Sequence, residues 1–194
     1  MNFKVLSVAA LLVSSLCFSA VATAEKMPES AKYKSDRIEK TLNTMLVEAL
    51  KAAALEMDKD HKMAPFAFVQ KKDGSIGFFT SIDDDAHKDE TVDQKIAGVR
   101  AMLIDLARTQ QINASVQVMY VSVFSGESNK GAQGLAFEVE HREGVSLMQF
   151  IPVVEVKDDA GKKTGELLFD MERLSTGSKP QTIFAASIVQ QAHK

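Results

Sequence analysis

The chain of 194 residues has little cysteine and no tryptophan: Cys17 is its one cysteine, and Tyr33 and Tyr120 are its two tyrosines. Cys17 lies in an amino-terminal segment that we expect to be removed, so the rest of the chain has no thiol. This excludes disulfides, thiolate metal sites and thiol catalysis. The absence of tryptophan and the presence of only two tyrosines also disfavour a sugar-stacking platform. Stability must therefore come from an apolar core.

Neither sign of charge is in large excess. The sequence has 23 Lys and Arg against 26 Asp and Glu, a formal net charge of −3. Such a mildly acidic balance argues against nucleic acid or an anionic membrane surface as a partner.

Residues 1–24 have the three parts of a secretory signal peptide. Lys4 supplies a positive charge, an apolar run extends from Val5 to Val13, and Ala22-Thr23-Ala24 is a small-x-small cleavage signal. The apolar run is shorter than the roughly 20 residues of a membrane span. We therefore expect cleavage after Ala24, a periplasmic location and no membrane span in the mature chain. We also expect a disordered lead-in over 25–35 and a single domain over 36–194.

Two stretches have the spacing of amphipathic helices. From Asp36 onward, apolar residues recur at steps of three and four, which predicts a long helix. These residues are Ile38, Leu42, Met45, Leu46, Ala49, Leu50, Ala53 and Met57. Thr91-Val92-Asp93-Gln94 is a capping box that opens a second helix, ending near Arg108. The Met and Leu stripe of the first helix could dock a partner helix, but we favour packing against the protein's own sheet.

A first hairpin is expected around Asp73-Gly74, with strands over 66–71 and 75–80. A two-residue turn would place Phe68 opposite Phe79, and large apolar side chains would then occupy both faces. The candidate residues of a pocket for an apolar ligand are Phe66, Phe68, Phe78 and Phe79. Burial in the core is the simpler explanation of these rings.

The stretch 135–152 predicts a long central hairpin, because apolar and polar residues alternate up to a turn at Gly144. A four-residue loop over 142–145 would place Phe137 opposite Phe150 and Val139 opposite Met148. We prefer this register because it keeps the apolar side chains together on one face.

The remaining elements complete the predicted sheet. A β-branched strand over 115–124 precedes the central hairpin, and a strand over 166–172 follows the turn at Asp158 to Gly161. Ser178-Lys179-Pro180-Gln181 resembles a helix start and leaves open a short closing helix over 183–191. The sequence thus predicts an α+β fold. We expect an antiparallel sheet of about six strands, a hairpin plus a four-stranded meander, with two long helices packed on one face.

No motif specifies a reaction, a metal or a cofactor. The acidic run over 83–90 lacks the glycine and glutamate of an EF-hand, and the loop over 126–133 lacks the lysine of a phosphate loop. Lys163-Thr164-Gly165 resembles part of a serine β-lactamase signature, but no Ser-x-x-Lys accompanies it. No two of the four histidines have the spacing of a zinc pair.

His141 is the one histidine with carboxylates close by in sequence. Strand alternation places it on the face opposite Glu138 and Glu140, so these side chains are not expected to converge. We expect a half-exposed histidine at a strand end rather than a metal ligand.

These observations favour a non-enzymatic binding or interaction module, with an envelope protein as its partner and no cofactor. Two alternatives stay open. One is a carrier of a small apolar ligand or lipid, and the other is a hydrolase whose site is assembled from residues distant in sequence.

Overall fold

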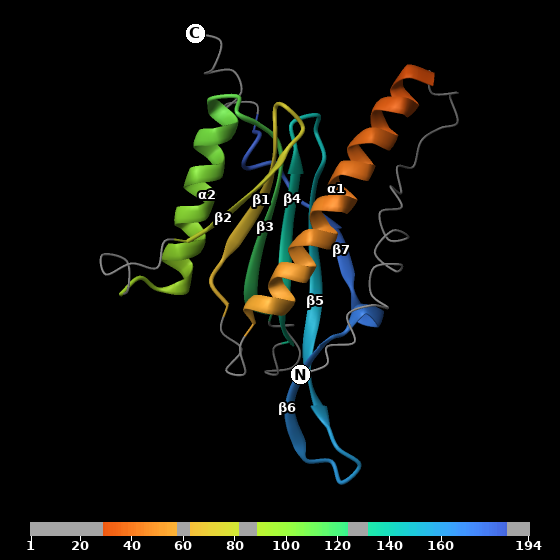
Figure 1. Cartoon of the computed structure of the whole chain (residues 1–194), viewed down its shortest axis with the longest axis vertical. Helices are drawn as coiled ribbons and strands as arrows, with labels where there is room; N and C mark the ends of the chain where they lie inside the picture. Colours follow the sequence, from red (N-terminus) through yellow and green to blue (C-terminus); the bar gives the residue numbers. More distant parts are fainter. Residues whose placement is uncertain (1–28, 58–62, 82–88, 124–131, 186–194) are drawn as a thin grey trace.

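The computed structural model describes residues 29–57, 63–81, 89–123 and 132–185. Within these residues two helices, seven strands and a short 3₁₀ helix are present (Figure 1). In chain order they are α1 (Glu29–Glu56), β1 (Phe66–Lys71), β2 (Ile76–Thr80), α2 (Val92–Arg108), β3 (Ile112–Val123), β4 (Ala132–His141), β5 (Ser146–Lys157), β6 (Lys163–Phe169), η3 (Met171–Arg173) and β7 (Ser175–Ser178). The expected signal peptide and most of the acidic run and of the glycine loop lie outside the described residues.

The strands form an antiparallel sheet, which confirms the predicted α+β class. Its order is β2-β1-β3-β4-β5-β6, with β7 also pairing with β5. β3 lies between β1 and β4, as its apolar residues on both sides predicted. The sheet has seven strands rather than about six, because β7 is a short polar strand without apolar alternation.

The two helices pack on opposite faces of the sheet, not on one face as predicted. α1 packs against Phe66 of β1 and Phe137 of β4, whereas α2 packs against Ala67 and Val69 of β1. Consecutive strand residues point to opposite faces, so Phe66 and Ala67 mark the two sides, here called the α1 face and the α2 face. Figure 1 shows the strands between the two helices. Apolar residues on both sides of the central strands require this double cover.

The helix prediction was right in kind and wrong at one boundary. α1 begins at Glu29, inside the stretch expected to be a disordered lead-in. The apolar periodicity that guided the prediction begins only where the helix meets the sheet. The Met and Leu stripe packs on the protein's own sheet, as favoured. The capping box of α2 is confirmed: Thr91 Oγ1 accepts from Gln94 N, and Thr91 N donates to Gln94 Oε1 at 2.7 Å.

The predicted register of the central hairpin is wrong by one residue. Phe137 lies opposite Gln149, and Val139 lies opposite Leu147. The loop has three residues, because His141 N donates to Val145 O and Gly144 N donates to His141 O. Gly144 has φ 97°, the positive value that completes this kind of loop after a type I turn.

The first hairpin repeats the same loop and the same correction. Phe68 lies opposite Phe78, not Phe79, and Gly74 has φ 87°. A third such loop at Gly161, φ 77°, joins β5 to β6. β6 begins at Lys163 and ends at Phe169, each three residues earlier than predicted, and η3 follows it. All three loops have three residues for one local reason, a glycine at positive φ in the third loop position, and this accounts for the two registers that were predicted wrongly.

Candidate functional site

The four phenylalanines proposed from the sequence do not form one wall. Phe66 is buried in the core beneath α1, and its ring lies 6.1 Å from that of Phe68 and 5.5 Å from that of Phe78. Phe68 and Phe78 lie 5.2 Å apart, and Phe78 is 48% exposed. Phe79 packs with the α2 face. The structure thus brings three of the rings together, and an apolar ligand site at these residues stays a prediction.

The predicted division of the carboxylates from His141 is confirmed. His141 lies opposite Ala114 on the α1 face, whereas Glu138 and Glu140 lie on the α2 face. The predicted half-exposure is wrong: His141 is 7% exposed. The reason is that α1 begins at Glu29 and its first turns cover the end of β4.

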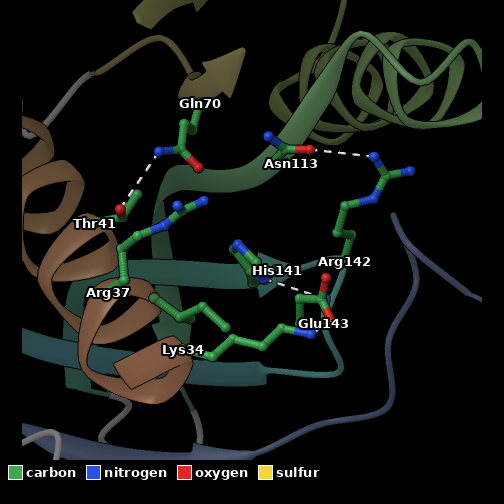
Figure 2. Close-up of a pocket in the computed structure, with 9 residues that line it drawn as sticks. Lys34, Arg37, Thr41, Gln70, Asn113, His141, Arg142 and Glu143 are labelled. Carbon is green, nitrogen blue, oxygen red and sulfur yellow. Dashed lines mark hydrogen bonds and ion pairs between the residues drawn. The ribbon is translucent and has the colours of Figure 1, made fainter. Parts of the chain in front are cut away.

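A basic pocket of about 410 Å³ lies over His141, between α1 and the β4–β5 turn (Figure 2). Its lining residues come from α1, β1, the start of β3 and the turn. They are Lys34, Arg37, Ile38, Thr41, Gln70, Asn113, His141, Arg142 and Glu143. The α1 residues share one helix face because they are spaced by three and four. We call this group the basic pocket.

Local structure positions the far side of the pocket. The pairing of β1 with β3 shifts between Gln70 and Lys71, which leaves Asn113 as an extra residue in β3. Asn113 Oδ1 accepts from Arg142 Nη1 at 3.2 Å, and its backbone carbonyl accepts from Arg142 N at 2.9 Å. Gln70 Nε2 donates to Thr41 Oγ1 at 3.4 Å across the pocket. These bonds hold the turn, β3 and α1 around the same space.

The charges of the pocket do not cancel. Lys34, Arg37 and Arg142 are cationic, and the one carboxylate, Glu143, accepts from Lys34 Nζ at 2.6 Å. Arg37 makes no ion pair or hydrogen bond within the described residues, and Figure 2 shows its guanidinium directed into the pocket. With His141 neutral, the lining has an excess of two positive charges. The pocket is therefore electropositive on a chain with a net charge of −3.

The protonation state of His141 follows from its contacts. Burial lowers the pKa of the imidazole, and Arg142, Lys34 and Arg37 lower it further against the opposing effect of Glu143. Its Nδ1 accepts a hydrogen bond from Glu143 N at 3.1 Å, so the proton of the neutral ring lies on Nε2. In Figure 2 this second nitrogen faces the interior of the pocket. His141 therefore presents an N–H donor there.

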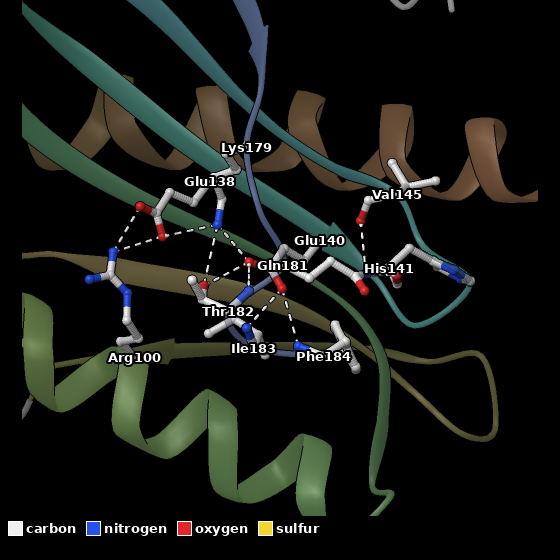
Figure 3. Close-up of polar contacts among 10 residues, drawn as sticks. All are labelled: Arg100, Glu138, Glu140, His141, Val145, Lys179, Gln181, Thr182, Ile183 and Phe184. Carbon is white, nitrogen blue, oxygen red and sulfur yellow. Dashed lines mark hydrogen bonds and ion pairs between the residues drawn. The ribbon is translucent and has the colours of Figure 1, made fainter. Parts of the chain in front are cut away.

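A second polar cluster lies on the α2 face, where Glu140 is 1% exposed (Figure 3). Glu140 Oε1 accepts from Lys179 Nζ at 2.5 Å, from Thr182 N at 2.9 Å and from Thr182 Oγ1 at 2.8 Å. Glu140 Oε2 accepts from Ile183 N at 2.8 Å and from Phe184 N at 3.1 Å. Both carboxylate oxygens are thus occupied. The cluster fastens residues 179–184 to the sheet.

The contacts of this cluster favour the ionised form of Glu140. Burial opposes ionisation of Glu140, but its hydrogen bonds from Lys179, Thr182 and Phe184 outweigh burial and hold its pKa below the usual value. Residues 183–185, where a closing helix was expected to begin, are not helical. The rest of that expected helix lies outside the described residues. Arg100 of α2 extends the network, with Nη2 2.8 Å from both oxygens of Glu138.

The sequence prediction missed the basic pocket. Lys34 was assigned to the expected lead-in, and Arg142 and Glu143 were assigned to a turn of different length. The available signal was the spacing of Lys34, Arg37 and Thr41, which places them on one face of a helix extended toward the amino terminus.

No group of three or more His, Cys, Asp or Glu side chains among the described residues is arranged to hold a metal ion. None of the helices described is long and apolar enough to span a membrane. No protein-family model matches the chain, and no curated protein or solved structure matches it significantly.

Proposed function

We propose that this chain is a non-enzymatic binding module and that its basic pocket holds a small anionic ligand bearing a phosphate or carboxylate group. The single observation that carries the proposal is the uncompensated positive charge of that pocket. Arg37 faces it without a carboxylate partner within the described residues. Cationic side chains clustered at one pocket of an otherwise acidic chain create a local positive potential that attracts anions.

The donors in the pocket suit an oxyanion. A guanidinium such as that of Arg37 offers a planar fork that matches phosphate and carboxylate oxygens. The Nε2–H of His141 adds a neutral donor at the floor, and the Gln70 amide can donate from the side. Because His141 is buried, a hydrogen bond from its Nε2–H is less weakened by competition with water than one made at the surface.

Binding fits these residues better than turnover does. His141 Nδ1 is bonded to a backbone N–H rather than to a carboxylate, so the ring is not oriented as the base of a hydrolytic triad. The Glu143 carboxylate is paired with Lys34, and Glu140 lies on the other face of the sheet with both oxygens occupied. A periplasmic location, inferred from the signal at residues 1–24, is part of the same proposal and is checked by cell fractionation.

Titration with inorganic phosphate and with citrate, followed by NMR and calorimetry, tests the proposal. We expect saturable shifts at Arg37, His141 and Arg142, weaker binding at high salt, and a loss of about tenfold or more in affinity for Arg37→Gln. The matched control is Lys51→Gln, which removes an exposed cation from the same helix away from the pocket.

Three results would contradict the proposal. The first is no saturable binding at millimolar anion, and the second is an equal loss of affinity in the Arg37→Gln and Lys51→Gln variants. The third is turnover of ester, phosphate or glycoside substrates by the wild type that the Arg37→Gln variant loses, which would make the pocket catalytic.

A further inference from the structure

β2 is the terminal strand of the described sheet and pairs with β1 alone. At the turn, Lys71 N donates to Ser75 O, so the odd-numbered residues of β2 exchange hydrogen bonds with β1. The N–H and C=O groups of the even-numbered residues Ile76, Phe78 and Thr80 therefore point away from the sheet. β2 thus presents a row of main-chain donors and acceptors at its free edge.

Within the described residues, the free edge of β2 lacks three features that commonly prevent strand pairing. Edge strands in soluble proteins are commonly protected by charge, proline or a bulge. β2 reads Ile-Gly-Phe-Phe-Thr and has no charge, no proline and an unbroken register with β1. At the opposite end of the sheet, β6 contains Lys163 and Glu166, and β7 is short and polar. Charged residues thus protect the β6 edge, whereas β2 has none.

Two apolar side chains of β2 are substantially exposed. Ile76 is 41% exposed and Phe78 is 48% exposed, and strand alternation puts both on the α1 face. α1 lies over β1, β3 and β4, and α2 lies over β1 and β3, so β2 forms the margin of both layers. One side of the Phe78 ring contacts Phe66 and Phe68, which leaves its other side for a neighbour.

We propose that β2 is a dimerisation edge, at which a second copy of this chain pairs its own β2 in antiparallel register centred on Phe78. In that register Phe78 lies opposite Phe78, and Ile76 lies opposite Thr80, so every pair uses the outward-pointing groups. Each such pair exchanges two hydrogen bonds. A register shifted by one residue would align outward groups with inward ones, and a shift of two would lose pairs.

A second copy fits this edge because the pairing is self-complementary. The two-fold axis brings no like charges together, since β2 has none, and it stacks the exposed Phe78 rings of both copies on the same face. Antiparallel pairing about a two-fold axis also closes the assembly as a dimer instead of extending it into a fibre. Because the contact is one short strand, the dimer forms at high protein concentration. It does not depend on anion binding at the basic pocket.

Disulfide trapping tests the register, because Cys17 is the chain's one cysteine and can be replaced by serine without touching the described residues. In this Cys17→Ser background, Phe78→Cys puts two thiols on the axis. Their Cα atoms would be about 5.5 Å apart, within the range that a disulfide spans. The matched control is Ile76→Cys, on the same face of the same strand but off the axis. We expect rapid oxidation to a covalent dimer for Phe78→Cys, slow oxidation for Ile76→Cys, and rapid heterodimer formation when Ile76→Cys is mixed with Thr80→Cys.

Sedimentation of the full chain from about 10 µM to 1 mM tests the dimer itself, since weak complexes populate only near their dissociation constant. We expect a concentration-dependent dimer that Phe78→Lys abolishes and Leu168→Lys, at an exposed position of β6, leaves unchanged. Ile76→Pro removes one outward N–H without affecting pairing to β1, and it should weaken the dimer about tenfold or more even if Phe78→Lys fails to fold. A wild type that stays monomeric throughout would overturn the proposal, as would equal trapping rates for Phe78→Cys and Ile76→Cys. An Arg37→Gln variant that loses anion binding but still dimerises would separate this proposal from the preceding one.

Discussion

The two faces of one sheet are covered in different ways. On the α1 face, a large apolar cluster includes Met45, Phe66, Phe137 and Ile151. On the α2 face, the apolar cluster is smaller, and the sheet beside it carries the buried carboxylate of Glu140. The carboxy-terminal segment over 179–184 covers Glu140 there: Thr182, Ile183 and Phe184 donate hydrogen bonds to its carboxylate, and the side chains of Ile183 and Phe184 join the apolar cluster.

The difference shows that alternating positions of the same strand can specify two kinds of core. An apolar face is stabilised by excluding water and by filled volume, and its loss on truncation scales with the cavity that is left. An ionic face depends on matched partners, because removing one partner leaves the other buried and uncompensated. The two faces should therefore respond differently to mutation and to pH.

The largest expected effect is the loss of the Glu140 carboxylate. Glu140→Ala leaves Lys179 and three main-chain N–H groups buried without their acceptor, and we expect a loss of about 3–5 kcal/mol in the free energy of unfolding. Urea denaturation measures it. Phe137→Ala on the α1 face is the comparison, with a similar loss of about 3–5 kcal/mol from a cavity. A loss below about 1 kcal/mol for Glu140→Ala would show that the fastening adds little.

The two faces should also lose stability in different pH ranges. The pKa values of His141 and Glu140 are both lower in the folded chain than in the unfolded chain. Each group therefore contributes its full stabilisation at pH values above its unfolded pKa. This stabilisation is lost as the pH falls through the folded pKa. The unfolded pKa is about 6.5 for His and about 4.3 for Glu. The free energy of unfolding should therefore begin to fall below about pH 6.5 because of His141, and to fall further below about pH 4.3 because of Glu140.

Urea denaturation across pH separates these two contributions. His141→Asn retains an acceptor for Glu143 N but cannot take up the proton. It should therefore reduce the pH dependence of the free energy of unfolding in the higher pH range, where His141 titrates, and not in the lower range. Glu140→Gln should reduce this pH dependence in the lower range, where Glu140 titrates, and not in the higher range. If each variant changed both ranges, the two faces would be coupled and the comparison would fail.

The smallest expected effect is a gain on the α1 face. Gln149 lies opposite Phe137, is 1% exposed, and its amide nitrogen and oxygen find no hydrogen-bond partner among the described residues. Unpartnered buried polar atoms are destabilising, so Gln149→Leu should raise the free energy of unfolding by about 1–2 kcal/mol. Thermal denaturation checks this. Gln117→Leu on the α2 face is the comparison. The Gln117 Oε1 also lacks a partner among the described residues, but its Nε2 donates to Ile96 O, so the replacement breaks a hydrogen bond and should be less stabilising than Gln149→Leu.

Much of the fold could be predicted from residue patterns, and the errors have a common origin. The capping box at Thr91, the central position of β3 and the separation of His141 from Glu138 all follow from periods of two or of three to four residues. The hairpin registers failed because the number of loop residues depends on the backbone conformation of one glycine, Gly144 or Gly74. The apolar pattern of the central hairpin favoured a loop with an even number of residues, because that register keeps Gln149 off the buried face. In the structure Gln149 is buried.

The candidate site was harder to predict, because its residues are distant in the chain. Arg37 and Arg142 line one pocket only because α1 lies across the end of β4. Lys179 reaches Glu140 only after β6, η3 and β7 return the chain along β5. No pattern of neighbouring residues in the sequence predicts these long-range contacts. The sequence by itself determined the capped α2, the alternation of each strand and the faces to which His141 and Glu140 point, because these depend on hydrogen bonds and side-chain directions within a few residues. Tertiary structure decided which face each helix covers, which residues pair across the hairpins and which charges converge, because these depend on loop conformation and on packing between distant segments.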